Sequence, residues 1–78
     1  MNYIPAPQIS GARVIRALEK AGFIQKRQSG SHVVMRHSFD LNRRCVIPVH
    51  GSAPIKPGTL RAILKGCGIS TEEFKKFL

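Results

Sequence analysis

The stretch FIQKRQSGSHVVMRHSFDLNRRCVIPVH, residues 23–50, decides the fold. It holds three segments with strand-like composition, 23–29, 31–37 and 44–50, which short polar turns separate. Strands joined by turns this short pair antiparallel, so the segment 31–37 is expected in the middle. Pro48 has no N–H to donate to a ladder, which favours an edge position for the third strand. The stretch therefore predicts a three-stranded antiparallel meander.

Helical patterns flank the meander on both sides. Before it, Ser10 is an expected N-cap, an apolar stripe follows at helical spacing, and Gly22 fits the position after the helix end. After it, a helix is predicted over 59–67 with Thr59 as its N-cap, and a short last helix over 70–78 begins with capping-box spacing. The buried face of the helix over 59–67 is expected to consist of Leu60, Ile63, Leu64 and Cys67.

These elements predict an α+β domain in the order α-β-β-β-α-α. With 78 residues the chain is expected to form one domain over 1–78, in which 1–9 are an extended lead-in. It has no apolar run near ~18 residues and no signal-peptide pattern, so we expect a cytoplasmic protein with no membrane contact. Cys45 and Cys67 lack C-x-x-C spacing and are expected to be buried free thiols.

The charge balance indicates a polyanionic partner. Lys and Arg number 13 against 4 acidic residues, giving a formal net charge of +9. Nucleic acid is the first candidate for such a surface. A membrane surface is less favoured because no long amphipathic basic helix with aromatic anchors is present. An acidic protein partner is equally compatible with the charge alone.

Alternation along the middle strand predicts which way its histidine points. Val33 and Met35 are the better core pair, so the opposite set should face away from the helices. His37 has odd spacing from His32, so the two cannot hold a metal together and His37 is expected at the rim. A solvated polar residue is the plain alternative for His32. The side chains predicted on or near this outer face are His32, Arg36, Arg44 and His50.

The four acidic residues are Glu19, Asp40, Glu72 and Glu73. No two of them form a pair suited to hold Mg²⁺ against phosphates. No phosphate-binding glycine loop or zinc spacing is present, so no metal or cofactor is expected. RNA can be cut without metal, because its 2′-hydroxyl can attack the adjacent phosphate. Histidine, with an ordinary pKa of ~6.5, suits the proton transfer, and cations suit the added charge. The candidate phosphate contacts are Lys26, Arg36, Arg44 and Lys65.

Five strings along residues ~8 to 77 resemble one bacterial toxin family. They are LEKAGF, GSHVVMRH, VIPVH, KPGTLRAILKGCGIS and EEF, in this order. The sequence resembles the HicA-type toxins of toxin–antitoxin pairs. The resemblance implies a fold similar to a double-stranded-RNA-binding domain, cleavage of mRNA independent of ribosomes, and neutralisation by a HicB-type antitoxin. Contact with DNA would then be indirect, through the antitoxin.

The resemblance also assigns residues. The family's catalytic histidine follows a Gly-Ser pair in the second strand, so it corresponds to His32, and Gly30 and Ser31 match the same motif. His50 matches a recurrent histidine whose role the resemblance does not settle. The lysine cluster that double-stranded-RNA-binding domains carry at their last helix is missing, which argues against duplex binding in that style. In its place the sequence offers Lys56, Arg61 and Lys65.

The leading hypothesis is a metal-independent endoribonuclease toxin in which His32 is the general acid or base. A non-catalytic RNA-binding module of the same fold would have the same charge pattern. A basic adaptor for an acidic protein is a third reading, and it predicts negligible RNA affinity at physiological salt. The sequence does not determine the cleavage specificity or which proton His32 moves.

Overall fold

A computed structural model describes residues 8–78, and most of the expected lead-in lies outside the described residues. The elements are α1 (Gly11–Lys20), β1 (Phe23–Ser29), β2 (His32–His37), β3 (Arg44–Pro48), α2 (Pro57–Cys67) and α3 (Thr71–Lys75). The predicted α+β order is confirmed. The differences are at element ends, where β3 stops at Pro48 and the last helix is shorter than predicted.

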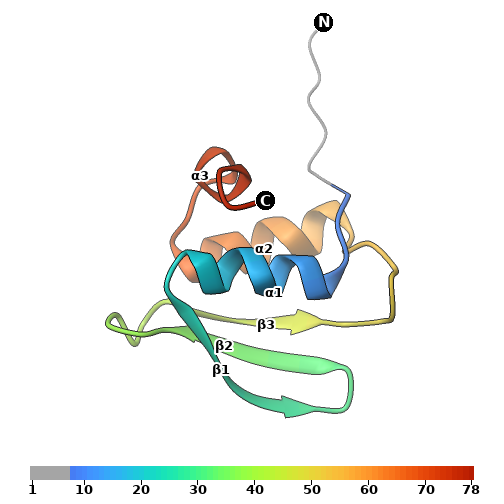
Figure 1. Ribbon diagram of the computed structural model, residues 1–78, viewed down its shortest axis with the longest axis horizontal. Helices are drawn as coiled ribbons and strands as arrows, with labels where there is room; N and C mark the ends of the chain where they lie inside the picture. Colours follow the sequence, from blue (N-terminus) through green and yellow to red (C-terminus); the bar gives the residue numbers. More distant parts are fainter. Residues whose placement is uncertain (1–7) are drawn as a thin grey trace, which may run out of the picture.

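The sheet is an antiparallel meander with strand order β1-β2-β3, so β2 is central and the strand with Pro48 lies at an edge, as predicted. Figure 1 shows α1 and α2 side by side on one face of the sheet, with α3 beyond them. Among residues 8–78, no helix lies on the opposite face of the sheet (Figure 1). This layout is that of a double-stranded-RNA-binding domain, and it leaves one sheet face open for function.

The hydrophobic core lies between the sheet and the helices. Val33 and Met35 of β2 are buried, and the alternate residues, the exposed His32 and the half-buried Val34 and Arg36, face away from the core. The predicted stripe on α2 is fully buried, and β3 adds alternate residues to the same cluster. The largest side chains in this core are Phe23, Phe74, Leu18, Met35, Ile47 and Leu60. The period-two pattern of β2 and the helical pattern of α2 therefore fix which face of the sheet is covered.

Two of the three predicted helix caps are confirmed. The Ser10 hydroxyl accepts from the Arg13 amide at 3.3 Å, and the Ser70 hydroxyl accepts from the Glu73 amide at 3.0 Å. The prediction for Thr59 is wrong, because α2 begins two residues earlier at Pro57. Proline suits the first helical position, where its fixed φ is helical and its missing N–H costs no hydrogen bond.

The end of α2 is tied to β3 by polar contacts. Arg43 donates from Nε to the Cys67 carbonyl at 2.7 Å, and its guanidinium lies 5.4 Å from the centre of the Phe23 ring. Both cysteines are free and buried, as predicted, and their Sγ atoms lie 3.1 Å apart. The hydrogen bond from Cys67, followed by burial, raises the pKa of the Cys45 thiol. These contacts hold the helix C-terminus against the strand that carries Arg44.

A glycine pair in α2 tests this helix–strand contact. A Cβ added at Gly66 would lie 2.7 Å from the Arg44 carbonyl oxygen, whereas one at Gly58 would meet only the end of the Arg61 side chain at 3.9 Å. We expect Gly66→Ala to lower the free energy of unfolding by about 1–3 kcal/mol through overpacking. The matched Gly58→Ala should raise it by about 0.4–1 kcal/mol, because it restricts the unfolded chain. Urea unfolding measures both, and a Gly66→Ala protein as stable as Gly58→Ala would contradict the packing of α2 on β3.

Candidate functional site

The open face of the sheet carries His32 at one end of β2. The residue is exposed, and its partners across the sheet are Ser29 on β1 and Pro48 on β3. Gly11, at the start of α1, packs against the Pro48 carbonyl from the helix side. His32 therefore stands on a backbone that is paired on both sides, and its imidazole is free to meet a ligand from solvent.

Arginines occupy the other end of the same face. Arg36 pairs across the sheet with Ile24 on β1 and with Arg44 on β3. Its Nε is buried and has no hydrogen-bond partner among residues 8–78. Like charges directly opposite on a sheet destabilise one another, and an unpaired buried donor is costly. An anion bound between Arg36 and Arg44 would relieve both effects. Four residues along a strand place this pair about 13 Å from His32.

A β-bulge brings to the open face an arginine, Arg27, that is not among the predicted site residues. The register shifts between Gln25 and Arg27, so that Arg27 instead of Lys26 pairs with Val34 on the open face. A regular strand would have placed Arg27 on the same side as Phe23. Arg27 borders a shallow hollow in the middle of the open face, together with Val34, Arg44, Cys45 and Val46. Lys26 is exposed and has no partner in the β1–β2 ladder.

The tight turn before His32 contains the two residues of the Gly-Ser motif. Gly30 has φ of 58°, a conformation suited to a two-residue hairpin turn and strained for other residues. Its carbonyl accepts from the Gln28 side chain at 3.1 Å. The Ser31 carbonyl accepts from the Val49 amide at 2.7 Å, which continues the β2–β3 ladder past Pro48. The motif therefore holds the backbone that presents His32, and it brings the chain after β3 close to it.

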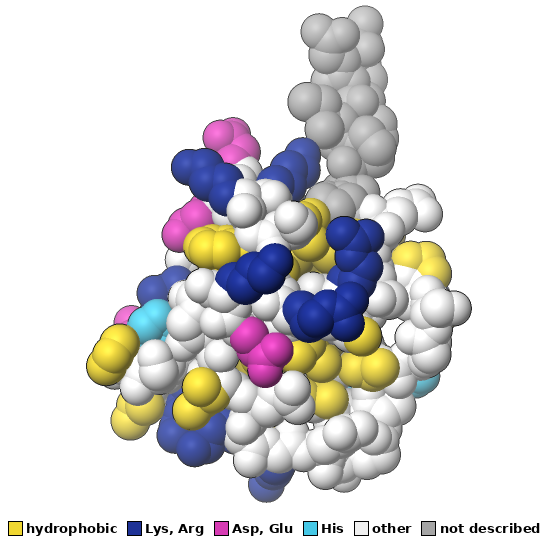
Figure 2. Space-filling view, viewed as in Figure 1, with side chains coloured by type: hydrophobic (Ala, Val, Ile, Leu, Met, Phe, Trp, Pro, Cys, Tyr) yellow, Lys and Arg dark blue, Asp and Glu magenta, His cyan; other side chains and the backbone are white. Residues whose placement is uncertain are grey.

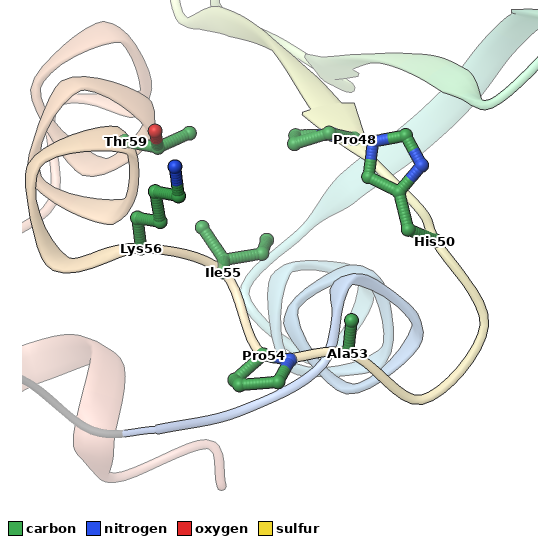
Figure 3. A pocket seen from close by; sticks show the side chains of 7 residues that line it. All are labelled: Pro48, His50, Ala53, Pro54, Ile55, Lys56 and Thr59. Carbon is green, nitrogen blue, oxygen red and sulfur yellow. The ribbon is translucent and has the colours of Figure 1, made fainter.

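A second hollow of about 320 Å³ opens where β3 ends and α2 begins (Figure 3). His50 borders it from the chain after β3, and Lys56 and Thr59 border it from the start of α2. The rest of its lining is apolar and consists of Pro48, Ala53, Pro54 and Ile55. Because Pro48 is the cross-strand partner of His32, this hollow adjoins the histidine end of the open face.

Two other predicted residues lie apart from this group. Lys65 is an exposed residue of α2 and so belongs to the helix layer, beside the glycine that contacts the Arg44 backbone. His37 is half-buried at the far end of β2, where its ring meets Phe23 edge-on with centroids 5.1 Å apart. Its Nδ1 accepts from the Phe39 and Asp40 amides, both at 3.1 Å. His37 therefore organises the turn after β2.

Positive charge is not confined to the open face. Figure 2 shows Lys and Arg side chains spread over the helix layer as well. The open face differs by combining arginines with exposed apolar side chains, Ile24 at 44% and Val46 at 49% exposure, and with the exposed His32. The four acidic residues lie elsewhere, on α1, in the turn after β2 and on α3. The local composition, more than the net charge, distinguishes this face.

Residues 8–78 contain no group of three His, Cys, Asp or Glu side chains placed to hold a metal ion. In the same part of the chain, no helix has the length and apolar character needed to cross a membrane.

Fold and site together define a class of small α+β protein. Its helices cover one face of a three-stranded meander, and its open face presents a histidine among arginines. A family model described as the HicA toxin of bacterial toxin–antitoxin systems matches residues 11–69, more than half of the chain. The chain belongs to this family of toxins, which implies an antitoxin as partner. No curated protein matches the sequence closely enough to count as a relative.

Proposed function

We propose that this toxin is a metal-independent endoribonuclease of the cytoplasm. It cuts mRNA when the 2′-hydroxyl attacks the neighbouring phosphate, and His32 transfers a proton in that step. Arg27, Arg36 and Arg44 bind the RNA backbone beside the cut. A HicB-type antitoxin keeps the toxin inactive, and the toxin itself meets DNA only through that antitoxin.

The observation that carries this proposal is an exposed His32 on an open sheet face that also bears the paired arginines Arg36 and Arg44. Imidazole moves protons near neutral pH, and guanidinium groups bind the other phosphates of a strand that runs along the same face. The central strand is a rigid support for such a group. Since the carboxylates lie away from this face, the proposed route uses the RNA's own hydroxyl and no bound metal.

A non-catalytic RNA-binding module with the same open face is the competing function. A digest of unstructured RNA by purified protein distinguishes the two. The endoribonuclease should convert the RNA to shorter products on a denaturing gel. A binding module would shift the RNA on a native gel and leave its length unchanged. An adaptor for an acidic protein would do neither at physiological salt.

Salt dependence tests which arginines meet the phosphates. Each phosphate contact on a single strand contributes about 0.7 to the slope of log affinity against log salt. Arg44→Gln should therefore reduce that slope by about 0.7. Arg16→Gln removes the same charge from α1 on the opposite side of the molecule, and it should leave the slope unchanged. Equal slopes for wild type and Arg44→Gln would remove this arginine from the interface.

The antitoxin is expected to cover the open face, because one surface then blocks both RNA entry and His32. A net charge of +9 favours an acidic inhibitor. Hydroxyl-radical footprinting of the complex checks this, since Val46 and Leu78 are similarly exposed, at 49% and 41%, on opposite sides of the molecule. Val46 should be protected by the antitoxin and Leu78 should not. Protection of Leu78 with Val46 still reactive would mean that the antitoxin acts from the helix side.

A further inference from the structure

The proposed reaction needs two proton transfers. One group takes the proton of the 2′-hydroxyl, and another gives a proton to the 5′-oxygen that leaves the phosphorus. Attack and departure lie on opposite sides of the phosphorus, so one imidazole does not serve both in a single step. His32 therefore requires a partner that stands within reach of the same phosphate.

The pairing of the sheet places His50 near His32. His32 pairs with Pro48, and the Val49 amide still donates to Ser31, so the ladder continues beyond the end of β3. Alternation puts the second residue after Pro48 on the same side as Pro48. His50 is then the diagonal neighbour of His32, a relation that separates Cα atoms by about 7–8 Å. Two imidazoles at this spacing can flank one phosphate.

The other titratable groups of the described chain do not meet this requirement. His37 is at the opposite end of β2, and its Nδ1 already accepts two backbone amides. Cys45 and Cys67 are buried free thiols that are hydrogen-bonded to each other. The carboxylates lie on α1, on α3 and in the turn after β2. Lys56 shares the hollow with His50, but its ammonium group only donates hydrogen bonds and has no acceptor atom, which suits it to bind a phosphate.

The hollow beside His50 gives the substrate a place to lie (Figure 3). Its apolar wall of prolines and Ile55 suits the face of a base or ribose, and Lys56 and Thr59 offer donors to a phosphate. If a nucleotide binds in this hollow, its phosphate would lie near Pro48, on the side of the hollow that adjoins His32. The volume of about 320 Å³ is at the lower end of small-ligand pockets.

We propose that His50 is the second proton-transfer group of the reaction, acting on the nucleotide held in the hollow between β3 and α2. This inference rests on the proposed ribonuclease function. One imidazole accepts the 2′-hydroxyl proton as the 2′-oxygen bonds to phosphorus. The other, as imidazolium, donates to the 5′-oxygen as its bond to phosphorus breaks. The products are a 2′,3′-cyclic phosphate and a 5′-hydroxyl, and each imidazole ends in the protonation state in which the other began.

The test uses an RNA oligonucleotide in which sulfur replaces the leaving 5′-oxygen at one cleavable bond. A thiolate leaves without being protonated, so this substrate bypasses the general acid and no other group. On ordinary RNA, His32→Gln and His50→Gln should each slow cutting by about 10²–10⁴-fold. On the sulfur substrate, one of the two variants should recover a rate near that of the wild type, and the other should stay slow. Thermal melting of both variants checks that they are folded.

Several results would overturn the inference. His50→Gln protein that cuts ordinary RNA at the wild-type rate removes His50 from the chemistry. A slow His50→Gln protein with neither variant rescued by sulfur shows that His50 serves only binding. In both cases the proposed function still holds if the wild-type protein cuts RNA and the His32→Gln protein does so slowly. A wild type that cuts no RNA overturns the proposed function and this inference together.

Discussion

Replacing His32 by alanine should lower the rate of RNA cutting by about 10²–10⁴-fold and leave the fold intact. The factor is the usual contribution of a positioned general acid or base. The side chain is exposed on an open sheet face and adds little packing, so the free energy of unfolding should change by no more than about 0.5 kcal/mol. Single-turnover cleavage of a defined RNA, with thermal melting of the same protein, measures both quantities.

His37→Ala provides the contrast for this experiment. Its ring packs against Phe23 and accepts two backbone amides of the following turn, so its loss should destabilise the protein. Below the melting temperature, the folded fraction of His37→Ala should cut RNA at a rate near that of the wild type. His32→Ala should therefore lower the cutting rate with little change in stability, and His37→Ala should lower stability with little change in the cutting rate. A folded His32→Ala protein with normal cutting would remove His32 from the mechanism.

A single 2′-deoxy substitution on the 5′ side of the cut should abolish cleavage at that bond. The proposed nucleophile is the 2′-hydroxyl of that nucleotide, and no other group in the reaction replaces it. The matched control is a 2′-deoxy nucleotide on the 3′ side of the same phosphate, which keeps the nucleophile and should still allow cutting. Product mapping on a sequencing gel reads both substrates. Cleavage at the deoxy-substituted bond would show that water or a protein group attacks the phosphate.

The fold was largely predictable because its deciding patterns are local. Two local patterns predict which faces are buried. They are the apolar alternation in β2 and β3 and the i, i+3, i+4 spacing in α2, and the structure buries those faces. The start of α2 was missed because Thr59 resembles a cap, whereas Pro57 begins the helix two residues earlier. The Lys56 side chain makes no capping hydrogen bond, so the usual signal of a helix start is absent there.

The composition of the site was less predictable than its location. Residues 24–29 of β1 are all exposed, so no apolar pattern reports the register of this strand, and the bulge that brings Arg27 to the open face leaves no mark in the sequence. Lys26, a predicted phosphate contact, lies at this bulge and has no partner in the β1–β2 ladder. The hollow at His50 depends on the path of the loop over residues 51–56, which brings Lys56 back toward the end of β3. Long-range proximity of this kind has no local sequence signal.

The most direct measurement of the central claim is the chemistry of the RNA ends produced in excess EDTA. If the open face cuts RNA through the 2′-hydroxyl with His32, wild-type protein should cut at an unchanged rate in EDTA. The fragments should carry a 2′,3′-cyclic phosphate and a 5′-hydroxyl by mass spectrometry, and His32→Ala protein should form almost none of them. Loss of cutting in EDTA that Mg²⁺ restores, or fragments with a 5′-phosphate and a 3′-hydroxyl, would contradict the claim.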